Sequence, residues 1–147
     1  MAWKSFCAFD VIGEPKGQPR PRSFFNKSTG HAAVYEKGTA EAWKSDIAIA
    51  ARNHLPTSPL EGPVRLDITF VFQRPKRLMR KKDPEGFVLH TAKPDRDNLD
   101  KAVMDALKNI GMFRDDSLVC SGLIEKFYAK KHGATGALIQ VFTHEEE

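Results

Sequence analysis

Carboxylate side chains bracket one amphipathic stretch of this sequence in a way that suits binding of a hard metal ion. Asp95 and Asp97 stand just before the helical pattern in AKPDRDNLDKAVMDALKNIGMFRDDSLV, residues 92–119, and Asp115 and Asp116 follow it. In an extended segment, residues two apart project to the same side, so the first pair would lie about 7 Å apart at the backbone. Oxygen ligands without a matching Cys/His set favour Mg²⁺ or Mn²⁺ over zinc. Few protein ligands would leave positions open for phosphate oxygens and water, as metal-assisted phosphodiester hydrolysis requires.

Each of these acids also has a purely structural interpretation. Asp97 stands at the expected N-cap, where free N–H groups and the helix dipole favour a carboxylate, and Asp95 would then be a loop residue. Turn chemistry explains one acid at 115–116, but two acids that lead into an apolar strand are harder to explain this way. They follow a helix of about 15 Å, so they rejoin the first pair only if the next strand runs back beside Asp95.

A lysine accompanies the carboxylates. Lys101 lies one helical turn beyond Asp97, and Asp105 lies one turn beyond Lys101, so the three form a polar stripe opposite the core. Such a stripe is compatible with an exposed ladder of ion pairs that contributes little. A lysine beside a carboxylate cluster also suits phosphodiester chemistry, where it orients water or neutralises developing charge.

The elements that must position these residues can be predicted from hydrophobic periodicity. A central helix is predicted over about 98–109, ended by Gly111 and with an apolar stripe of Leu99, Val103, Ala106, Leu107 and Ile110. Another helix is predicted to begin at Thr39, with Trp43, Ile47, Ala50 or Ala51, and His54 with Leu55 on one stripe. Alternation predicts strands over 3–12, where Cys7, Phe9 and Val11 share a face, and over 64–73; two more are predicted over 117–129 and 136–143.

The remaining segments are predicted to be connections. The Pro- and Gly-rich segment 13–22 is neither helix nor central strand, and 23–36 is predicted to be an irregular hairpin. Residues 74–94 form a long basic loop, KKHGATG a hairpin loop between the last two strands, and 145–147 a solvated acidic tail. The whole chain, 1–147, is predicted to be a single α+β domain with a mixed or antiparallel sheet and two main helices.

Composition restricts the compartment and the partners. The net charge of +4 permits a polyanionic partner without requiring one, and no apolar run is long enough to cross a membrane. The N-terminal stretch contains Lys4 and Asp10, so it is not a secretory signal. Cys7 and Cys120 lack metal-ligand spacing, which favours two buried free thiols in a reducing cytoplasm over a disulfide.

Basic residues lie directly upstream of the acidic stretch and in the Pro-rich segment. A basic run is usually a solvated loop, but next to a carboxylate site it suggests sequence-independent contacts to DNA phosphates. The candidates for DNA binding are Lys16, Arg20, Arg22, Arg74, Lys76, Arg77, Arg80, Lys81, Lys82 and Lys93. Phe24 or Phe25 would stack at a DNA junction, although packing within the hairpin is the simpler interpretation.

The stretch KPDRDNLDKAVMDALKNIGMFRDDSLV resembles the signature of the RusA family of Holliday junction resolvases, which occur in bacteria and are often encoded by prophages. The match consists of D-x-D-N-L-x-K, then D-A-L, then a short gap to D-D. GEPKGQPRPRSFF also resembles the family's Pro- and Arg-rich N-terminal segment, although less specifically. The basic insertion at 74–92 departs from the pattern of compact members.

The resemblance implies site residues, a cofactor and partners. Asp95, Asp97 and Asp116 match the metal-binding catalytic aspartates, Lys101 matches the essential lysine, and Asp115 is a neighbouring acid that is a further candidate metal ligand. The family implies an Mg²⁺-dependent homodimer in the bacterial cytoplasm that introduces paired symmetric nicks into four-way DNA junctions during recombination and repair. Two other classes stay open: a metal-dependent nuclease acting on other branched or single-stranded DNA, and a non-catalytic DNA-binding module.

Overall fold

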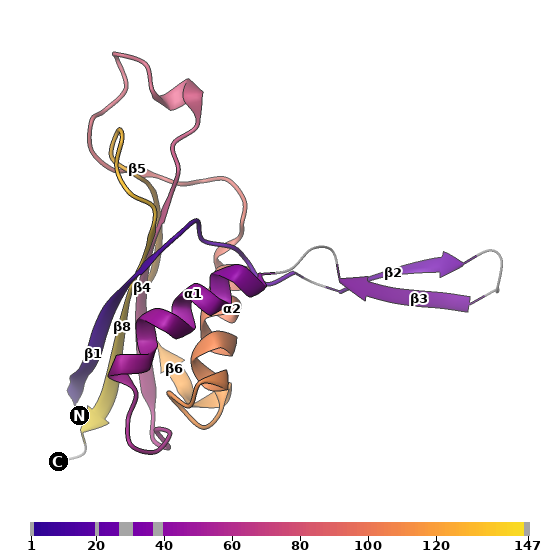
Figure 1. The fold of residues 1–147 in the computed structure, drawn as a ribbon, viewed down its shortest axis with the longest axis vertical. Helices are drawn as coiled ribbons and strands as arrows, with labels where there is room; N and C mark the ends of the chain where they lie inside the picture. The colour runs from indigo at the N-terminus through magenta and orange to yellow at the C-terminus, as the bar shows by residue number, and fades with distance from the viewer. Residues whose placement is uncertain (1, 20, 27–30, 37–39, 146–147) are drawn as a thin grey trace.

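The computed structural model describes residues 2–19, 21–26, 31–36 and 40–145, and within 21–26 and 31–36 it describes the backbone alone. A six-stranded sheet has the order β1-β8-β4-β7-β5, with β6 also paired to β4. Its strands are β1 (Ala2–Ile12), β4 (Val64–Phe72), β5 (Val88–Leu89), β6 (Val119–Ser121), β7 (Ile124–Tyr128) and β8 (Gly136–Glu145). The helices α1 (Glu41–Ala51) and α2 (Arg96–Asn109) pack together on one face of this sheet (Figure 1). Because β4 pairs with β8 antiparallel and with β7 parallel, the sheet is mixed, and the predicted α+β class is confirmed.

Strand β4 forms the centre of the core. Its burial alternates strictly along Val64–Phe72, as the sequence predicts, because every second side chain faces the helices. Trp43, Ile47 and Ala51 of α1 are buried against this face together with the apolar stripe of α2. Helix α1 begins at Glu41, and a short 3-10 turn, η1 (Arg52–His54), follows it. The residue proposed to begin it, Thr39, lies outside the described residues.

Helix α2 begins earlier than the sequence predicts. Its N-cap residue is Asp95, in an extended conformation with φ −70° and ψ 149°, whereas Asp97 lies in the first turn. The prediction that Asp97 is the N-cap was therefore wrong, and the Asp95 side chain makes no capping hydrogen bond either. The other end agrees with the sequence, because α2 stops at Asn109 and Gly111 has a positive φ of 88°.

The C-terminal strands differ from the prediction. Residues 117–129 do not form one strand: a 3-10 turn, η3 (Asp116–Leu118), precedes β6, and Gly122 separates β6 from β7. A Cβ atom at Gly122 would lie 1.7 Å from the carbonyl oxygen of Leu66, so only glycine fits this close approach. The predicted hairpin between 117–129 and 136–143 is also wrong, since β4 lies between β7 and β8.

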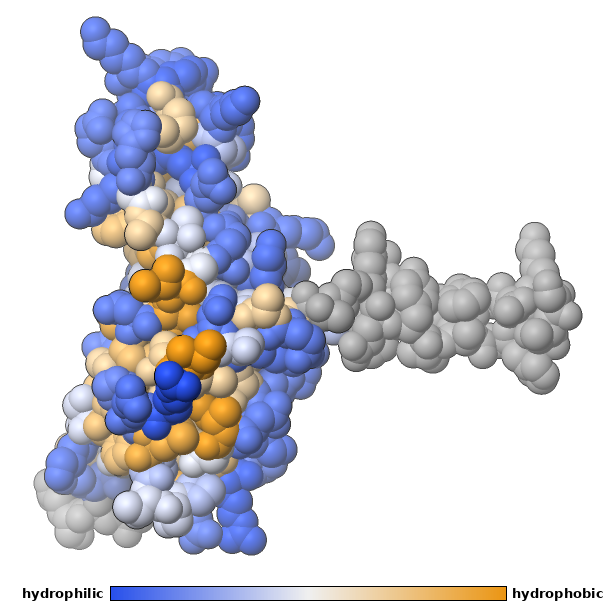
Figure 2. Space-filling view, in the orientation of Figure 1, coloured by the Kyte–Doolittle hydropathy of each residue, from blue (hydrophilic) through white to orange (hydrophobic). Residues whose placement is uncertain are grey.

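Two segments extend from the sheet and helices. β2 (Pro21–Asn26) and β3 (His31–Glu36) pair antiparallel, which confirms the predicted hairpin, and they form an arm in Figure 1. The loop that links β4 to α2 forms a lobe at the top of Figure 1 and contains a 3-10 turn, η2 (Lys76–Leu78), as well as β5. Mostly hydrophilic side chains cover this lobe, whereas hydrophobic ones gather over the body below it (Figure 2).

The cysteines and the C-terminal residues also differ from the predictions. Cys7 is half-buried but Cys120 is exposed, so the prediction of two buried thiols was wrong for Cys120; both are free. Glu145 belongs to β8 and lies 3.4 Å from the ammonium of Lys4, so the acidic tail is not wholly unstructured at its first residue. Within the described part of the chain, every helix is too short or too polar to span a bilayer.

Candidate active site

A lysine of the sheet holds the backbone that leads into Asp95 and Asp97. Lys126 of β7 donates hydrogen bonds to the carbonyl oxygens of Ala92 and Pro94, each at 2.7 Å. The peptide bond between Lys93 and Pro94 is cis. Both aspartates are exposed, Asp95 at the helix N-cap and Asp97 in the first turn. The positive end of the α2 dipole therefore lies beside both carboxylates.

The Pro-rich segment passes across the first turn of α2. The N–H of Gln18 donates to the carbonyl oxygen of Asn98 at 2.8 Å, and a Cβ atom on Gly17 would lie 3.0 Å from Asn98 Cβ. Together with α2, the segment encloses a hollow of about 510 Å³. Its lining consists of Gln18, Pro19, Asp97, Asn98, Asp100, Lys101 and Met104. Both segments carry predicted site residues, and the structure brings them into contact.

Asp115 and Asp116 have different surroundings. The Asp115 side chain accepts hydrogen bonds from the hydroxyl and the N–H of Ser117, and it lies 3.3 Å from the ammonium of Lys108. The bonds from Ser117, and then Lys108, lower the pKa of Asp115 to about 2. Asp115 is exposed, whereas Asp116 is half-buried and faces α2. Asp116 is therefore the member of the pair that is placed to act together with α2.

A second hollow, of about 320 Å³, lies between α2 and residues 116–124. These residues run back along the helix and are called the return segment below. The hollow is lined by Leu66, Arg96, Asp100, Met104, Asp116, Val119, Ser121, Gly122 and Ile124. The Oδ1 atom of Asp116 is buried and has no hydrogen-bond partner among the described residues. Burial raises the pKa of Asp100; Arg96 lowers it and Asp116 raises it further. Asp100 and Asp116 are thus close enough to interact electrostatically, because the return segment runs beside the first turns of α2.

The four predicted metal ligands, all of them described residues, do not form one cluster in the structure. Among the described residues, no three His, Cys, Asp or Glu side chains are grouped closely enough to hold a metal ion. The set of Asp95, Asp97, Asp115 and Asp116 therefore stays a prediction, as does the approach of Asp116 to Asp95. Neighbouring carboxylates repel one another when both are ionised, and a bound cation offsets this repulsion. The buried Oδ1 of Asp116 has no hydrogen-bond partner among the described residues, and Asp100 lines the same hollow together with Arg96. Two carboxylates there suit a hard divalent cation.

Asp100 is the acidic residue that the sequence analysis did not select. The signal was available, because Asp100 lies three residues after Asp97 and so on a neighbouring part of the helix surface. Asp100 does not share the spacing of Asp97, Lys101 and Asp105, so it falls outside the polar stripe. The position of the return segment, which makes Asp100 face Asp116, is a long-range property.

Lys101 is exposed and tethered at one side. Its ammonium lies 3.8 Å from Asp105, which also lies 3.7 Å from the ammonium of Lys44 on α1. The pair of Lys101 and Asp105 agrees with the structural interpretation of the stripe, and Asp105 extends the pairing to the neighbouring helix. Since Lys101 also lines the hollow that contains Asp97, its charge is available there.

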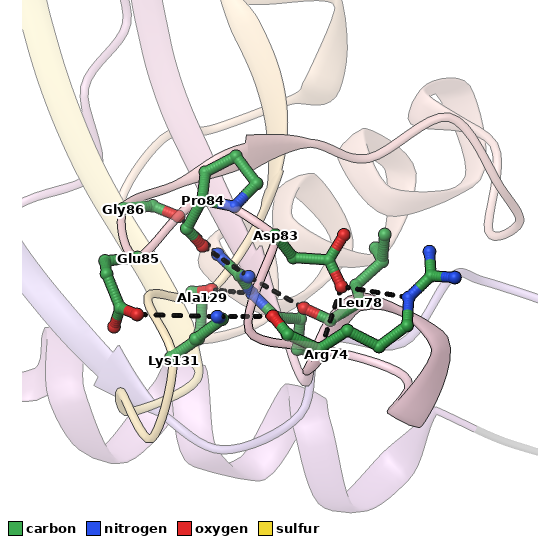
Figure 3. A network of polar contacts seen from close by, with 9 residues as sticks. Arg74, Leu78, Asp83, Pro84, Glu85, Gly86, Ala129 and Lys131 are labelled. Atoms are coloured by element: carbon green, nitrogen blue, oxygen red, sulfur yellow. Dashed lines mark hydrogen bonds and ion pairs between the residues drawn. The ribbon is translucent and has the colours of Figure 1, made fainter.

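The predicted DNA-binding residues fall into two groups. Arg74 is buried, with only 7% of its surface exposed, and it organises the lobe from within. Its guanidinium donates to the carbonyl oxygens of Leu78, Pro84, Gly86 and Ala129 (Figure 3). All of this hydrogen bonding is to backbone, so Arg74 supports the loop and, contrary to the expectation, does not present its charge to DNA.

The other basic residues of the lobe lie on its surface. Lys76, Arg77, Arg80, Lys81, Lys82 and Lys93 are all exposed. Arg80 is held near the loop by Asp83, whose carboxylate accepts from the backbone N–H of Arg80 at 2.9 Å. Lys16 is exposed in the Pro-rich segment. Arg20 and the side chains of Arg22, Phe24 and Phe25 lie outside the described part of the structure.

Comparison with known proteins agrees with this site. The family model for the endodeoxyribonuclease RusA matches residues 13–139, a range that includes the Pro-rich segment, α2 and both aspartate pairs. The chain is also 32% identical over 128 residues to the "uncharacterized protein YqaN" of Bacillus subtilis (strain 168), and the match covers 84% of this chain and 88% of that protein. The chain therefore belongs to the RusA family of endodeoxyribonucleases, which resolve Holliday junctions.

Proposed function

We propose that this protein is an Mg²⁺-dependent, structure-selective endodeoxyribonuclease that resolves four-way DNA junctions by paired symmetric nicks in recombination and repair. The observation that carries the proposal is the placement of Asp116 beside the first turns of α2, in a chain whose family resolves such junctions. A shared metal site requires Asp116 to approach Asp95 and Asp97 as well, and its place beside the first turns of α2 supports this.

Asp95, Asp97 and Asp116 would hold Mg²⁺, for which Mn²⁺ can substitute. When bound, the cation supplies Lewis-acid stabilisation of the charge that develops on the phosphodiester. The carboxylates orient it, and the dipole of α2 offsets part of their repulsion. Asp115 is the weakest candidate ligand, because Ser117 and Lys108 already engage its carboxylate. Lys101 supplies a positive charge from the adjoining hollow and is suited to orient water or stabilise the transition state.

Exposed basic residues would bring the DNA to these acids. The lobe offers Lys76, Arg77, Arg80, Lys81 and Lys82, and Lys16 lies on the segment that crosses α2. Their contacts with phosphates would be independent of sequence and sensitive to salt. Each subunit has one such site, so cutting two strands in coordination calls for a homodimer whose twofold axis matches that of the junction.

The deciding experiment compares Mg²⁺-dependent cleavage of a four-way junction, a flap, a single strand and a linear duplex. Paired symmetric nicks in the junction alone are expected. Asp95→Asn and Asp97→Asn should each abolish cleavage while the fold is kept, because an amide cannot supply an anionic ligand. Asp10→Asn, at an exposed position of β1, is the matched control and should cleave normally.

The other outcomes separate the alternatives. Cleavage of flaps or single strands in preference to the junction would identify a nuclease with a different target. Junction binding without cleavage would identify a DNA-binding module. The mass of the free protein and of the junction complex tests the dimer, and a monomer that cuts both strands in concert would refute it.

A further inference from the structure

Asp100 forms part of the wall of both hollows at the candidate active site. It lines the hollow that contains Asp97 and Lys101, and it also lines the hollow that contains Asp116. Residues three apart in an α-helix differ by about 60° around the axis, so Asp97 and Asp100 are surface neighbours. Asp100 thus stands between a carboxylate of its own helix and one from the return segment.

The surroundings of Asp100 leave negative charge only partly compensated. It is half-buried and close enough to Asp116 for their charges to interact, and the partnerless Oδ1 of Asp116 lies in the same region. Arg96 lines the same hollow and offsets part of this charge. A buried carboxylate oxygen without a donor costs free energy that a cation would recover.

We propose that Asp100 is a further carboxylate ligand of the divalent cation, acting together with Asp116 across the hollow that both residues line. The inference deepens the proposed function and rests on it. It assigns a role to a residue outside the D-x-D-N-L-x-K and D-D positions that match the family signature. With Asp100 included, the first turns of α2 contribute a ligand that faces the return segment.

The test measures Mn²⁺ binding to the full chain by calorimetry and by electron paramagnetic resonance, without DNA. Asp100→Asn should weaken Mn²⁺ binding about tenfold to a hundredfold, because the isosteric amide removes one anionic ligand. The rise in melting temperature that Mn²⁺ causes should shrink accordingly. In the presence of a chelator the variant should melt no lower than the parent chain, which shows that the fold is intact. If Asp100→Asn melts at a lower temperature than the parent chain in the chelator, Asp100→Ser is measured as well. That variant must then show the same loss of Mn²⁺ binding.

Asp10→Asn is the control that should keep the parental Mn²⁺ affinity. Asp97→Asn is the control that should lose it. Mn²⁺ affinity that stays at the parental value in Asp100→Asn and Asp100→Ser, but falls in Asp97→Asn, would overturn the role of Asp100 and leave the proposed function standing. If the parent chain binds no Mn²⁺ and cuts no junction, both proposals fail together. Binding lost in Asp100→Asn and retained in Asp10→Asn supports the assignment.

Discussion

The ammonium of Lys126, in the sheet, lies 2.7 Å from the carbonyl oxygen of Pro94, directly before the first site aspartate. A second hydrogen bond of the same length reaches Ala92. The sheet thus fixes the backbone that leads into α2, although Lys126 lies far from the acidic stretch in sequence. Its charge is used to hold backbone in place.

Lys126→Met should therefore affect both stability and catalysis. Losing two charge-assisted hydrogen bonds is expected to lower the free energy of unfolding by about 1–3 kcal/mol. Junction cleavage should fall more than junction binding, because the segment that it releases carries Asp95 and Asp97. Chemical denaturation and single-turnover cleavage measure the two effects. Lys4→Met removes the same charge at an exposed surface pair and should change neither.

Lys101→Ala should separate rate from affinity. An ammonium beside the carboxylates acts mainly on charge in the transition state, so a rate loss of about a hundredfold or more is expected. Affinity arises from many distributed phosphate contacts and should change little. Lys130→Ala, at another exposed lysine, is the control. Equal losses of rate and affinity in Lys101→Ala would make Lys101 an ordinary DNA contact.

Neutralising the lobe tests its part in DNA binding. Changing Arg77, Arg80, Lys81 and Lys82 together to Gln should weaken junction binding and flatten its salt dependence by up to about four contacts, roughly 0.9 log units of slope each. Mn²⁺ binding should be unchanged, because none of the four lines the hollows at α2. An unaltered salt slope would show that the lobe does not meet the DNA.

Arg74→Met should instead unfold the lobe. Four backbone carbonyls lose their donor, and the cost is expected to be about 3 kcal/mol or more. Trypsin should then cut within 76–82 much faster than in the parent chain. Arg77→Met, at an exposed position, should leave the melting temperature almost unchanged. A lobe that resists trypsin equally in both variants would contradict the role of Arg74.

The two thiols should react at different rates. Burial raises the pKa of Cys7 to about 11, so at pH 8 almost none of it is thiolate, whereas Cys120 is exposed. Ellman's reagent should find one fast thiol, and Cys120→Ser should remove that phase. Because the Cys7 thiolate becomes populated as pH rises towards 11, the slow phase should accelerate with pH. A fast phase that survives in Cys120→Ser would contradict this.

Local patterns in the sequence predicted the elements well. The alternation of Val64–Phe72 and the apolar stripe of α2 depend on neighbouring residues, and both are seen as predicted. The insertion of β4 between β7 and β8 depends on partners distant in sequence, so a short loop such as KKHGATG wrongly suggested a hairpin. The break at Gly122 was missed because apolar residues precede it at 118–120 and follow it at 123–124, as in a continuous strand.

For the candidate site, too, features that depend on local sequence were predictable, whereas those that depend on distant contacts were not. Residue types and spacing sufficed to select the two aspartate pairs and Lys101 as candidates, and their role in metal binding and catalysis stays a prediction. Burial is not visible in composition, so Arg74 was grouped with the exposed basic residues of its loop. Asp100 was missed for the same reason, because its importance depends on the segment that returns beside it.

Strand β8 lies between β1 and β4, so among the described strands β1, at the edge of the sheet, pairs with β8 alone. During translation, residues 2–12 therefore have no partner in this sheet until residues 136–145 have left the ribosome. The helices can pack on the core face of β4 earlier. The edge of β4 that pairs with β8 stays open until residues 136–145 are available. Ribosome-bound chains that stop before residue 136 would expose two unpaired strand edges and invite association with other nascent chains.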